Sequence, residues 1–332
     1  MKKTFLFSAF FLVVISLIGA NELFVPHALI SEAKTITIEP GMGSRKIGEF
    51  LKQQGIIRSK WAFVTYVSLR GEASYLQPGE YTFGQEAIPQ IVAELLRGGP
   101  KDITVVFPEG WTTTDIGTEL ERRGLSTRQA FTAATVPPRS ESFRNTYPFL
   151  QGRPVQSGLE GYLFPDTYRF FKDASADQVV AKMLENFNNK LSPELQAGIR
   201  ASGHSLYQIL TMASLIEKEV PTDEDRALVS GILWKRIEQG IPLQVDATIL
   251  YITQKKTALV SVQDTLIDSP YNTYRYTGLP VGPIANPGMS AIRAALYPKS
   301  SPYLFYLSRP DGKTVFSRTF AEHTAAKAQY LK

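Results

Sequence analysis

The sequence predicts an α+β protein made of an N-terminal membrane helix, small α+β modules and a larger mixed α+β domain. Three observations predict this class: an uncharged, mostly apolar run opens the chain, an internal repeat follows within residues 35–131, and helical and strand-like patterns fill the remainder. With 332 residues and 43% apolar content, the chain is long enough for two or three folded units.

Composition excludes several kinds of site. The chain has no cysteine, so it has no disulfide, no thiolate zinc site and no cysteine nucleophile. His27, His204 and His323 lie far apart and show no ligand spacing, so we predict no metal and no other cofactor. The net charge of +5 is compatible with nucleic acid, anionic lipid or an acidic polymer. Because no basic cluster is present and the chain is predicted to be exported, nucleic acid is a poor fit.

Residues 1–25 carry an export signal that can be read in two ways. "MKK" precedes the apolar run, and the small residues of "LIGA" suit the cleavage site of a signal peptide. A membrane anchor needs about 20 apolar residues, which is met only if the segment continues to Val25. Lys2 and Lys3 keep the N-terminus in the cytoplasm, and both readings place the bulk of the chain outside it.

The internal repeat relates residues 35–63 to residues 102–131. The residues that recur sixty-nine positions later are Gly41, Ile47, Gly48, Leu51 and Gly55, which return as Gly110, Ile116, Gly117, Leu120 and Gly124. Each copy predicts a strand, a Pro/Gly turn and a short amphipathic helix closed by glycine. With the intervening hairpin-like piece and helix, we predict one module at 35–100 and a second copy at 101–133. Both are of the kind that binds or positions a ligand.

A linker and a third unit follow. Residues 134–157 are polar and proline-bearing, which predicts a linker, and residues 158–332 form the third unit. Its elements are an aromatic segment at 158–170, helical patterns at 175–200, 206–219 and 223–239, a helix near 290–296, and a strand-turn-strand at 303–317. If the repeat copies only position a ligand, a fragment from about Gly152 onward should fold and work alone.

An apolar helical segment, "LTMASLIEKEV", ends with Glu217 and Glu219 only two positions apart. On a helical wheel Glu217 continues a stripe formed by Leu206, Leu210 and Ala213. Burial on that face raises a carboxyl pKa, which suits a general acid, although a last-turn glutamate paired with a lysine or arginine is the open alternative. Glu219 points roughly 200° away and is predicted to support the helix end.

The loop "YNTYRYTGLPVGPIANPG" at 271–288 combines glycines and prolines with aromatic and amide side chains. Turns explain the glycines and prolines but not Tyr271, Asn272, Thr273, Tyr274 and Asn286 together. Aromatic faces beside amide and hydroxyl groups are suited to a sugar chain, and a merely structural loop is the alternative.

Four ordered motifs resemble those of the endolytic murein transglycosylases, the YceG-like (MltG) family, over nearly the whole chain. They are "EGYLFPDTY" (160–168), "ASLIEKE" (213–219), "LQVDATILY" (243–251), and the 271–288 loop followed by "AIRAALYP" (291–298). The resemblance implies a single-pass anchor in the cytoplasmic membrane over residues 1–25. It also implies LysM-like modules and a catalytic domain at 158–332, outside that membrane, that cuts nascent peptidoglycan strands.

The resemblance also implies site residues. The first glutamate of the family's "EKE" motif is catalytic and falls on Glu217. Substrate binding is assigned to Gln244, Asp246, Thr248, Tyr251, Tyr271, Asn272, Thr273, Tyr274 and Asn286. Asp246 and Glu160 are candidate supports for the acid. Lys235 and Ala247 depart from the family pattern, which expects asparagine and proline there, and they put fine substrate preference in question.

The implied activity is that of a lytic transglycosylase. Glu217 protonates the oxygen between MurNAc and GlcNAc in the β-1,4 bond and then, as a carboxylate, deprotonates the MurNAc C6 hydroxyl. A 1,6-anhydro end forms and strand elongation stops. The expected partners are peptidoglycan strands, with synthesis enzymes as candidates. Two other functions remain open: a non-catalytic envelope glycan-binding or scaffold protein, and a lysozyme-type hydrolase that releases reducing ends.

Overall fold

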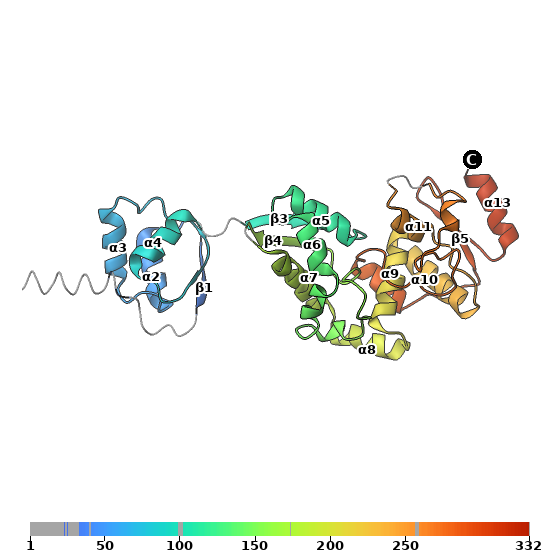
Figure 1. Cartoon of the computed structure of the whole chain (residues 1–332), viewed down its shortest axis with the longest axis horizontal. Coiled ribbons are helices and arrows are strands. Elements are labelled where there is room, and N and C mark those ends of the chain that lie inside the picture. The colour runs from blue at the N-terminus through green and yellow to red at the C-terminus, as the bar shows by residue number, and fades with distance from the viewer. Residues whose placement is uncertain are drawn as a thin grey trace, which may run out of the picture. The chain divides into compact units, whose positions relative to one another are not determined.

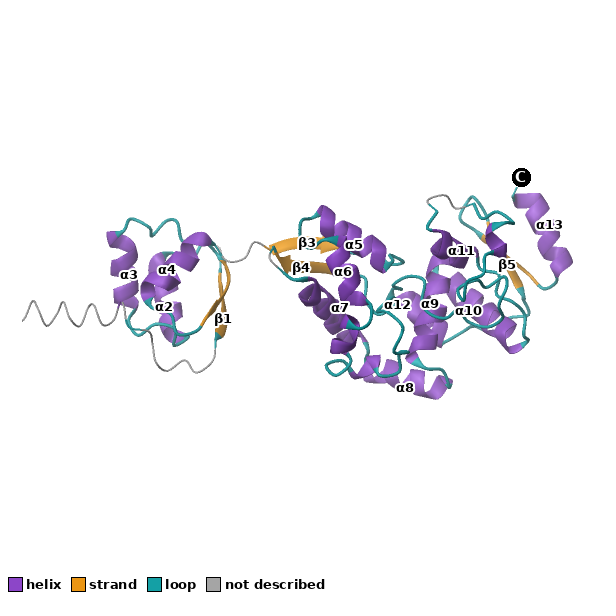
Figure 2. Cartoon of the chain, viewed as in Figure 1, coloured by secondary structure: helices purple, strands orange, loops and turns teal. Residues whose placement is uncertain are grey.

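The computed structural model describes Leu23, Val25 and residues 33–39, 41–98, 102–172, 174–255 and 259–331. The chain divides into two compact units, the first reaching to Asp102 and including 171–173, the second formed by 103–170 and 174–332 (Figure 1). Helices combined with short two-stranded sheets confirm the mixed α+β class (Figure 2). No helix in these described ranges has the length and hydropathy needed to cross a membrane. The predicted anchor at 1–25 lies outside them, apart from Leu23 and Val25.

The first unit has the predicted strand, turn and helix. Its elements are β1 (Lys34–Ile38), α2 (Ser44–Gln53), α3 (Lys60–Leu69), β2 (Gly79–Phe83) and α4 (Ile88–Arg97). β1 and β2 pair in antiparallel fashion, with Ile36 opposite Tyr81. Because side chains alternate along a strand, Ile36 and Ile38 both point inward, where they join Leu51 and Phe83 in a buried core.

The second unit begins with the second repeat copy. β3 (Asp102–Val106) lies beside β4 (Thr167–Phe171), and α5 (Thr113–Arg122) and α6 (Arg128–Thr135) follow β3 along the chain. Thr112 caps α5 by accepting a hydrogen bond from the Asp115 N–H, 3.1 Å away. The strand, turn and helix are those the repeat predicts. This copy folds into the same compact unit as residues 174–332, so it is not a separate module.

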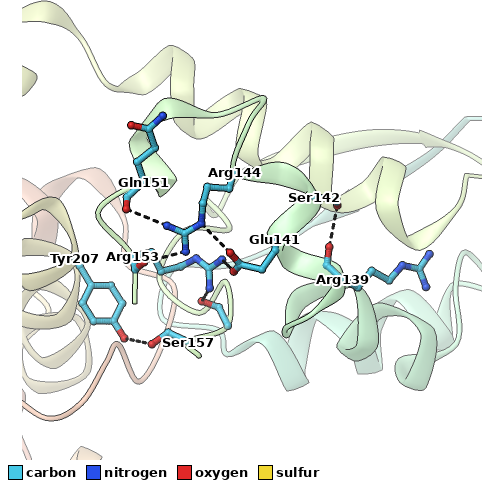
Figure 3. A network of polar contacts seen from close by, with 9 residues as sticks. Arg139, Glu141, Ser142, Arg144, Gln151, Arg153, Ser157 and Tyr207 are labelled. Carbon is cyan, nitrogen blue, oxygen red and sulfur yellow. Dashed lines mark hydrogen bonds and ion pairs between the residues drawn. The ribbon is translucent and has the colours of Figure 1, made fainter. Parts of the chain in front are cut away.

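The segment predicted as a linker, residues 134–157, is folded into the second unit. It contains the short 3₁₀ helices η1 (Arg139–Phe143) and η2 (Pro148–Leu150). Arg153 is 2% exposed and pairs with Glu141, while Arg144 donates to the carbonyl oxygens of Gln151 and Arg153 at 2.9 and 3.0 Å (Figure 3). The polar residues that predict a linker therefore bond to one another.

Helix α9 (Leu206–Glu219) has the bounds the sequence predicts. Ser205 and Gln208 form its capping box. Every residue from 209 to 216 is buried, because α10 (Asp223–Glu238) and α12 (Met289–Leu296) both pack against the helix. The other elements of the second unit are α7 (Ala176–Lys190), α8 (Pro193–Ser202), α10 (Asp223–Glu238), α11 (Asp246–Thr253), η3 (Asp264–Leu266), α12 (Met289–Leu296), β5 (Phe305–Ser308), β6 (Thr314–Ser317) and α13 (Phe320–Tyr330).

The chain after α12 docks closely on α10. The Lys299 N–H donates to the Ala227 carbonyl oxygen at 2.9 Å. A Cβ on Gly231 would lie 2.1 Å from the Lys299 carbonyl oxygen, so only glycine allows this approach. From there the chain enters the antiparallel β5–β6 hairpin, against which α13 packs.

Candidate functional site

The last turn of α9 places its two glutamates in different surroundings. Glu219 lines a pocket of about 440 Å³ between α9, the loop before α11, the β5–β6 hairpin and α13. The side chains that surround it there include Arg236, Gln244, Asp246, Tyr274, Phe305, Tyr306, His323 and Lys327. A pocket of this size with a few convergent polar groups is typical of a ligand site.

The carboxyl group of Glu219 is poised to carry a proton near neutral pH. Burial raises its pKa from 4.5 to about 7, which a hydrogen bond with Tyr306 opposes and the charge of Asp246 reinforces. Asp246 in turn accepts a hydrogen bond from the Tyr274 hydroxyl. The result is a carboxylic acid at a pocket wall, close to a second carboxyl group and two tyrosines.

Gln244 is held in a strained conformation at the same wall. Its φ is 53°, in the left-handed region that side chains other than glycine rarely adopt. Arg236 is 6% exposed and donates to Gln244 Oε1 at 3.1 Å and to the Pro242 carbonyl at 2.6 Å. The Gln244 N–H also donates to the Thr273 carbonyl at 3.0 Å. Strain that several contacts maintain is common at functional sites.

Glu217 is fully engaged inside the protein. Its side chain is 5% exposed, Arg226 donates to Oε1 at 2.7 Å, and the Gly288 N–H donates to Oε2 at 2.9 Å. Burial raises its pKa, while the Gly288 N–H and the Arg226 guanidinium oppose that rise. The turn at Gly110, whose φ is 77°, covers it: a Cβ there would lie 3.5 Å from Glu217 Cγ. Glu217 thus has the arginine partner that the sequence left open.

The predicted binding residues fall into separate groups. Gln244, Asp246 and Tyr274 share the pocket with Glu219. Four others, Thr248, Asn272, Thr273 and Asn286, are at most 1% exposed.

The contacts of these four buried residues are internal. Thr273 Oγ1 accepts from the Val245 N–H at 3.0 Å, and Asn272 Nδ2 donates to the Ile267 carbonyl at 2.7 Å. Thr248 bonds to Thr273. These contacts hold the 271–288 loop against the residues at the start of α11.

Asn286 joins the second repeat copy to the rest of the unit. Its Oδ1 accepts from the Gly161 and Leu163 N–H groups at 2.9 and 3.0 Å. Its Nδ2 donates to the Trp111 carbonyl at 3.0 Å and to Glu160 at 2.8 Å. All four hydrogen-bonding sites of the amide, its two lone pairs and two N–H groups, are therefore used, and the side chain fixes the loop relative to the Trp111 turn.

A second polar group lies around Glu160, the other predicted support. Glu160 accepts from the Thr113 N–H at 2.9 Å, and burial raises its pKa to about 7. Burial and the nearby Glu160 raise the pKa of Tyr251, whose ring centroid lies 5.0 Å from that of Tyr271. Tyr251 and Tyr271 do not line the pocket of Glu219, so the structure separates them from Asp246 and Tyr274.

Among the pocket residues that the sequence does not predict are Glu219, Tyr306 and Arg236. Helical periodicity gives only the angle between Glu217 and Glu219, so it does not reveal what covers each of them. Tyr306 comes from a hairpin almost ninety positions away and has no local signal. Within the described residues, no group of three His, Asp or Glu side chains could hold a metal ion.

The chain is similar to proteins of one family. Residues 36–329 match the YceG-like family. A Bacillus subtilis (strain 168) protein named endolytic murein transglycosylase is 34% identical over 307 residues, which cover 89% of this chain and 84% of that protein. A Streptococcus pneumoniae protein of the same name is 28% identical over 322 residues, and these cover 90% of this chain but 58% of the longer relative.

A solved structure shares the fold. The crystal structure of a yceG-like protein from Listeria monocytogenes superposes with a TM-score of 0.63 at 30% sequence identity. The match covers 89% of this chain and 99% of that one, so it extends over both compact units.

Proposed function

The chain belongs to the YceG-like family, and from that premise we propose that it is an endolytic lytic transglycosylase that cleaves peptidoglycan. Two relatives that carry the name endolytic murein transglycosylase support this activity, and so does the match over residues 36–329. The observation that carries the proposal is a buried carboxyl group, Glu217, whose pKa burial raises and whose oxygens Arg226 and the Gly288 N–H hold in place. A purely structural or scaffold protein has no need of such a group.

The proton transfers are assigned to Glu217, the first glutamate of the "EKE" motif, on which the family resemblance places the acid. A general acid must hold a proton at the working pH, and burial raises the pKa of Glu217. Arg226 and the Gly288 N–H hold its two oxygens in place at 2.7 and 2.9 Å. Glu219, two positions later, lines the pocket described above and is assigned no proton transfer.

The proposed reaction proceeds without water. Glu217 donates its proton to the oxygen that joins MurNAc C1 to GlcNAc, and this C–O bond breaks. The MurNAc C6 hydroxyl oxygen attacks C1 and gives its proton to the Glu217 carboxylate, which restores the acid. The products are a 1,6-anhydroMurNAc end and a GlcNAc hydroxyl. Asp246 and Tyr274, whose side chains form a hydrogen bond with each other, belong to the proposed substrate-binding surface.

The setting of this reaction is proposed as well. Residues 1–25 anchor the chain in the cytoplasmic membrane, and the catalytic unit acts on its outer side on strands that are still being made. Cleavage there ends strand elongation, with synthesis enzymes as partners. The first compact unit, which the sequence predicts to be LysM-like, positions the strand. The basic start of the chain and the apolar run after it support this topology.

Product analysis tests the reaction. Purified full-length protein is incubated with uncrosslinked glycan strands, and the products are weighed by mass spectrometry. A lytic enzyme releases internal fragments that are one water lighter than those of a hydrolase and lack a reducing end. Hydrated fragments would identify a lysozyme-type hydrolase, and an absence of fragments would favour the glycan-binding protein.

A pair of variants tests the assignment. Glu217→Gln should lower the rate of anhydro-end formation by ~10²–10⁴-fold, because the amide keeps the shape of the side chain but cannot give a proton. Glu219→Gln, two positions along the same helix, is the matched control and should retain most activity. A Glu217→Gln variant that cuts at the normal rate, or an inactive Glu219→Gln variant beside it, would overturn the assignment.

A further inference from the structure

The turn between β3 and α5 places a second carboxyl group beside Glu217. Glu109 precedes Gly110, whose turn covers the end of α9, and its side chain reaches Gly288 on the loop before α12. A Cβ on Gly288 would lie 1.8 and 2.6 Å from the two oxygens of Glu109, so this carboxylate lies directly against the Gly288 backbone. The N–H of the same glycine donates to Glu217 Oε2 at 2.9 Å. Glu109 and Glu217 therefore meet at one glycine.

The turn that carries Glu109 is held in place on both sides. Phe107, two positions before it, is 1% exposed. The Gly110 N–H donates to the Asn286 carbonyl at 2.9 Å, and the Gly110 carbonyl accepts from Lys218 Nζ at 3.2 Å. The backbone at Glu109 is therefore fixed between a buried ring and two hydrogen bonds, one of which comes from α9 itself.

Glu217 needs a neighbour of negative charge to act as an acid. Burial raises the pKa of Glu217, and the Gly288 N–H, Arg226 and Lys218 oppose that rise, because each of them favours the charged form. A carboxylate held in its charged form has no proton to give. The negative charge of Glu109 acts in the same direction as burial. Glu109 thus offsets part of what the positive partners do.

The charge of Glu109 is not taken up by another side chain. Asp223, on α10, lies 3.6 Å from Arg226 and accepts a hydrogen bond from Ser290, so it has partners of its own. Glu109 is exposed and has no hydrogen-bond or ion-pair partner among the residues that the structure describes. An unpaired carboxylate contributes little to folding, so its contact with Gly288 calls for another explanation.

We propose that Glu109 is a positioning residue of the cleavage reaction: its carboxylate, held against Gly288, disfavours the charged form of Glu217 and so keeps the proton on the acid. The proposal rests on the proposed function, because it takes Glu217 as the general acid. The second repeat copy then has a part in the reaction, since its turn brings Glu109 to α9. The first copy has Pro40 at the matching position and supplies no such group there.

The experiment compares the pH dependence of kcat/KM for the full-length wild type and its Glu109→Gln variant on uncrosslinked glycan strands. The alkaline limb of this profile reports the loss of the proton from Glu217 in the free enzyme. Removal of the Glu109 charge should move the limb to lower pH. We expect kcat/KM to fall about threefold on the limb, as is typical of a charge in contact with water, and to stay unchanged on its acid side.

Two controls sharpen the result. Glu238→Gln removes an exposed carboxylate from the other end of α10, and it should leave the profile unchanged. In about 1 M salt the difference between the wild type and Glu109→Gln should nearly vanish, because salt screens an exposed charge. An unmoved limb in Glu109→Gln would overturn the proposal. A fall that is equal at every pH would overturn it too, because Glu109 would then act on the substrate and not through the proton of Glu217.

A titration without turnover separates this proposal from the proposed function. The glutamate carboxyl carbons of the full-length protein are labelled with ¹³C, and Glu217→Gln identifies the Glu217 signal by its loss. The midpoint of that signal should lie at lower pH in Glu109→Gln than in the wild type, and equal midpoints would refute the proposal. If the wild type makes no anhydro ends, the reaction is refuted while this comparison still decides whether Glu109 holds the proton on Glu217.

Discussion

At the residue scale, the chemistry of α9 depends on what each glutamate meets. Glu217 and Glu219 are two positions apart on one helix, yet the first meets an arginine and a backbone N–H, and the second meets a tyrosine hydroxyl and another carboxyl group. Burial raises the pKa of Glu217 despite its positive partners, and burial together with the neighbouring Asp246 raises the pKa of Glu219 to about 7. One helix turn thus carries two carboxyl groups whose protonated form burial favours.

The pKa of Glu219 predicts a pH-dependent stability. Between pH 4.5 and about 7 the folded protein keeps a proton that the unfolded chain has released, so the free energy of unfolding falls as pH rises. Above pH 7 the free energy of unfolding is lower by about 3 kcal/mol, because each unit of pKa shift corresponds to about 1.36 kcal/mol. Glu219→Gln removes this loss, so the variant should be more stable than the wild type near pH 8 and equally stable near pH 4. Urea denaturation at both pH values measures the difference.

The comparison between the wild type and Glu219→Gln isolates one carboxyl group. Glu160 has a similarly raised pKa, but it is present in both proteins and cancels in the stability comparison. An equal stability difference at both pH values would show that Glu219 does not exchange its proton on folding.

At the element scale, the helices were more predictable than their surroundings. The sequence predicts α9 with its capping box, because the apolar period and the Ser205–Gln208 pair are local signals. It runs α7 and α8 together, although Ser192 and Pro193 begin a new helix. The polar composition of residues 134–157 predicts a linker, because composition does not show that Arg153 is buried against Glu141.

The site was predictable in part for the same reason. The motifs name Gln244, Asp246 and Tyr274, which the structure brings into one pocket with Glu219. They also name Thr273 and Asn286, whose side chains form hydrogen bonds inside the protein. A motif shows which residues act together. It does not show which of them face a ligand, because that depends on chain segments far away in the sequence.

Helix α10 gives a prediction at this scale. Gly231→Ala would place a methyl group 2.1 Å from the Lys299 backbone oxygen, and a backbone cannot move aside as a flexible side chain can. The variant should lose about 2 kcal/mol, as overpacked sites do. Thermal unfolding measures this loss. Gly152→Ala is the control, since open space surrounds Gly152 and stability should change by less than about 0.5 kcal/mol. Equal melting temperatures for the two variants would refute the close approach.

At the scale of the whole molecule, the boundary between the units falls earlier than the repeat suggests. The second copy belongs with the catalytic unit, where Phe107 and Phe131 are buried and the Gly110 N–H donates to the Asn286 carbonyl at 2.9 Å. The expectation that residues from Gly152 onward fold alone conflicts with this arrangement. Removing residues 103–151 would take both side chains out of the core and leave β4 without its partner strand β3.

The boundary predicts the behaviour of two fragments. Residues 101–332 should fold cooperatively and still produce anhydro ends, while residues 152–332 should not give a cooperative thermal transition. Circular dichroism follows folding, and mass spectrometry follows the products. A stable, active fragment from Gly152 would show that the second copy is dispensable.

The two copies of the repeat also differ in how freely they can be rebuilt. Gly41 and Gly110 occupy the same place in the duplicated turn, with φ of 85° and 77°, but only open space surrounds Gly41. Gly110 contacts the Glu217 side chain, and its carbonyl accepts a hydrogen bond from Lys218 at 3.2 Å. A reporter tag or a foreign loop can therefore be spliced into the chain at 41–43, whereas the same graft at 110–112 would displace the end of the catalytic helix. Of the two turns that the repeat creates, only the one at Gly41 can accept an insertion without disturbing α9.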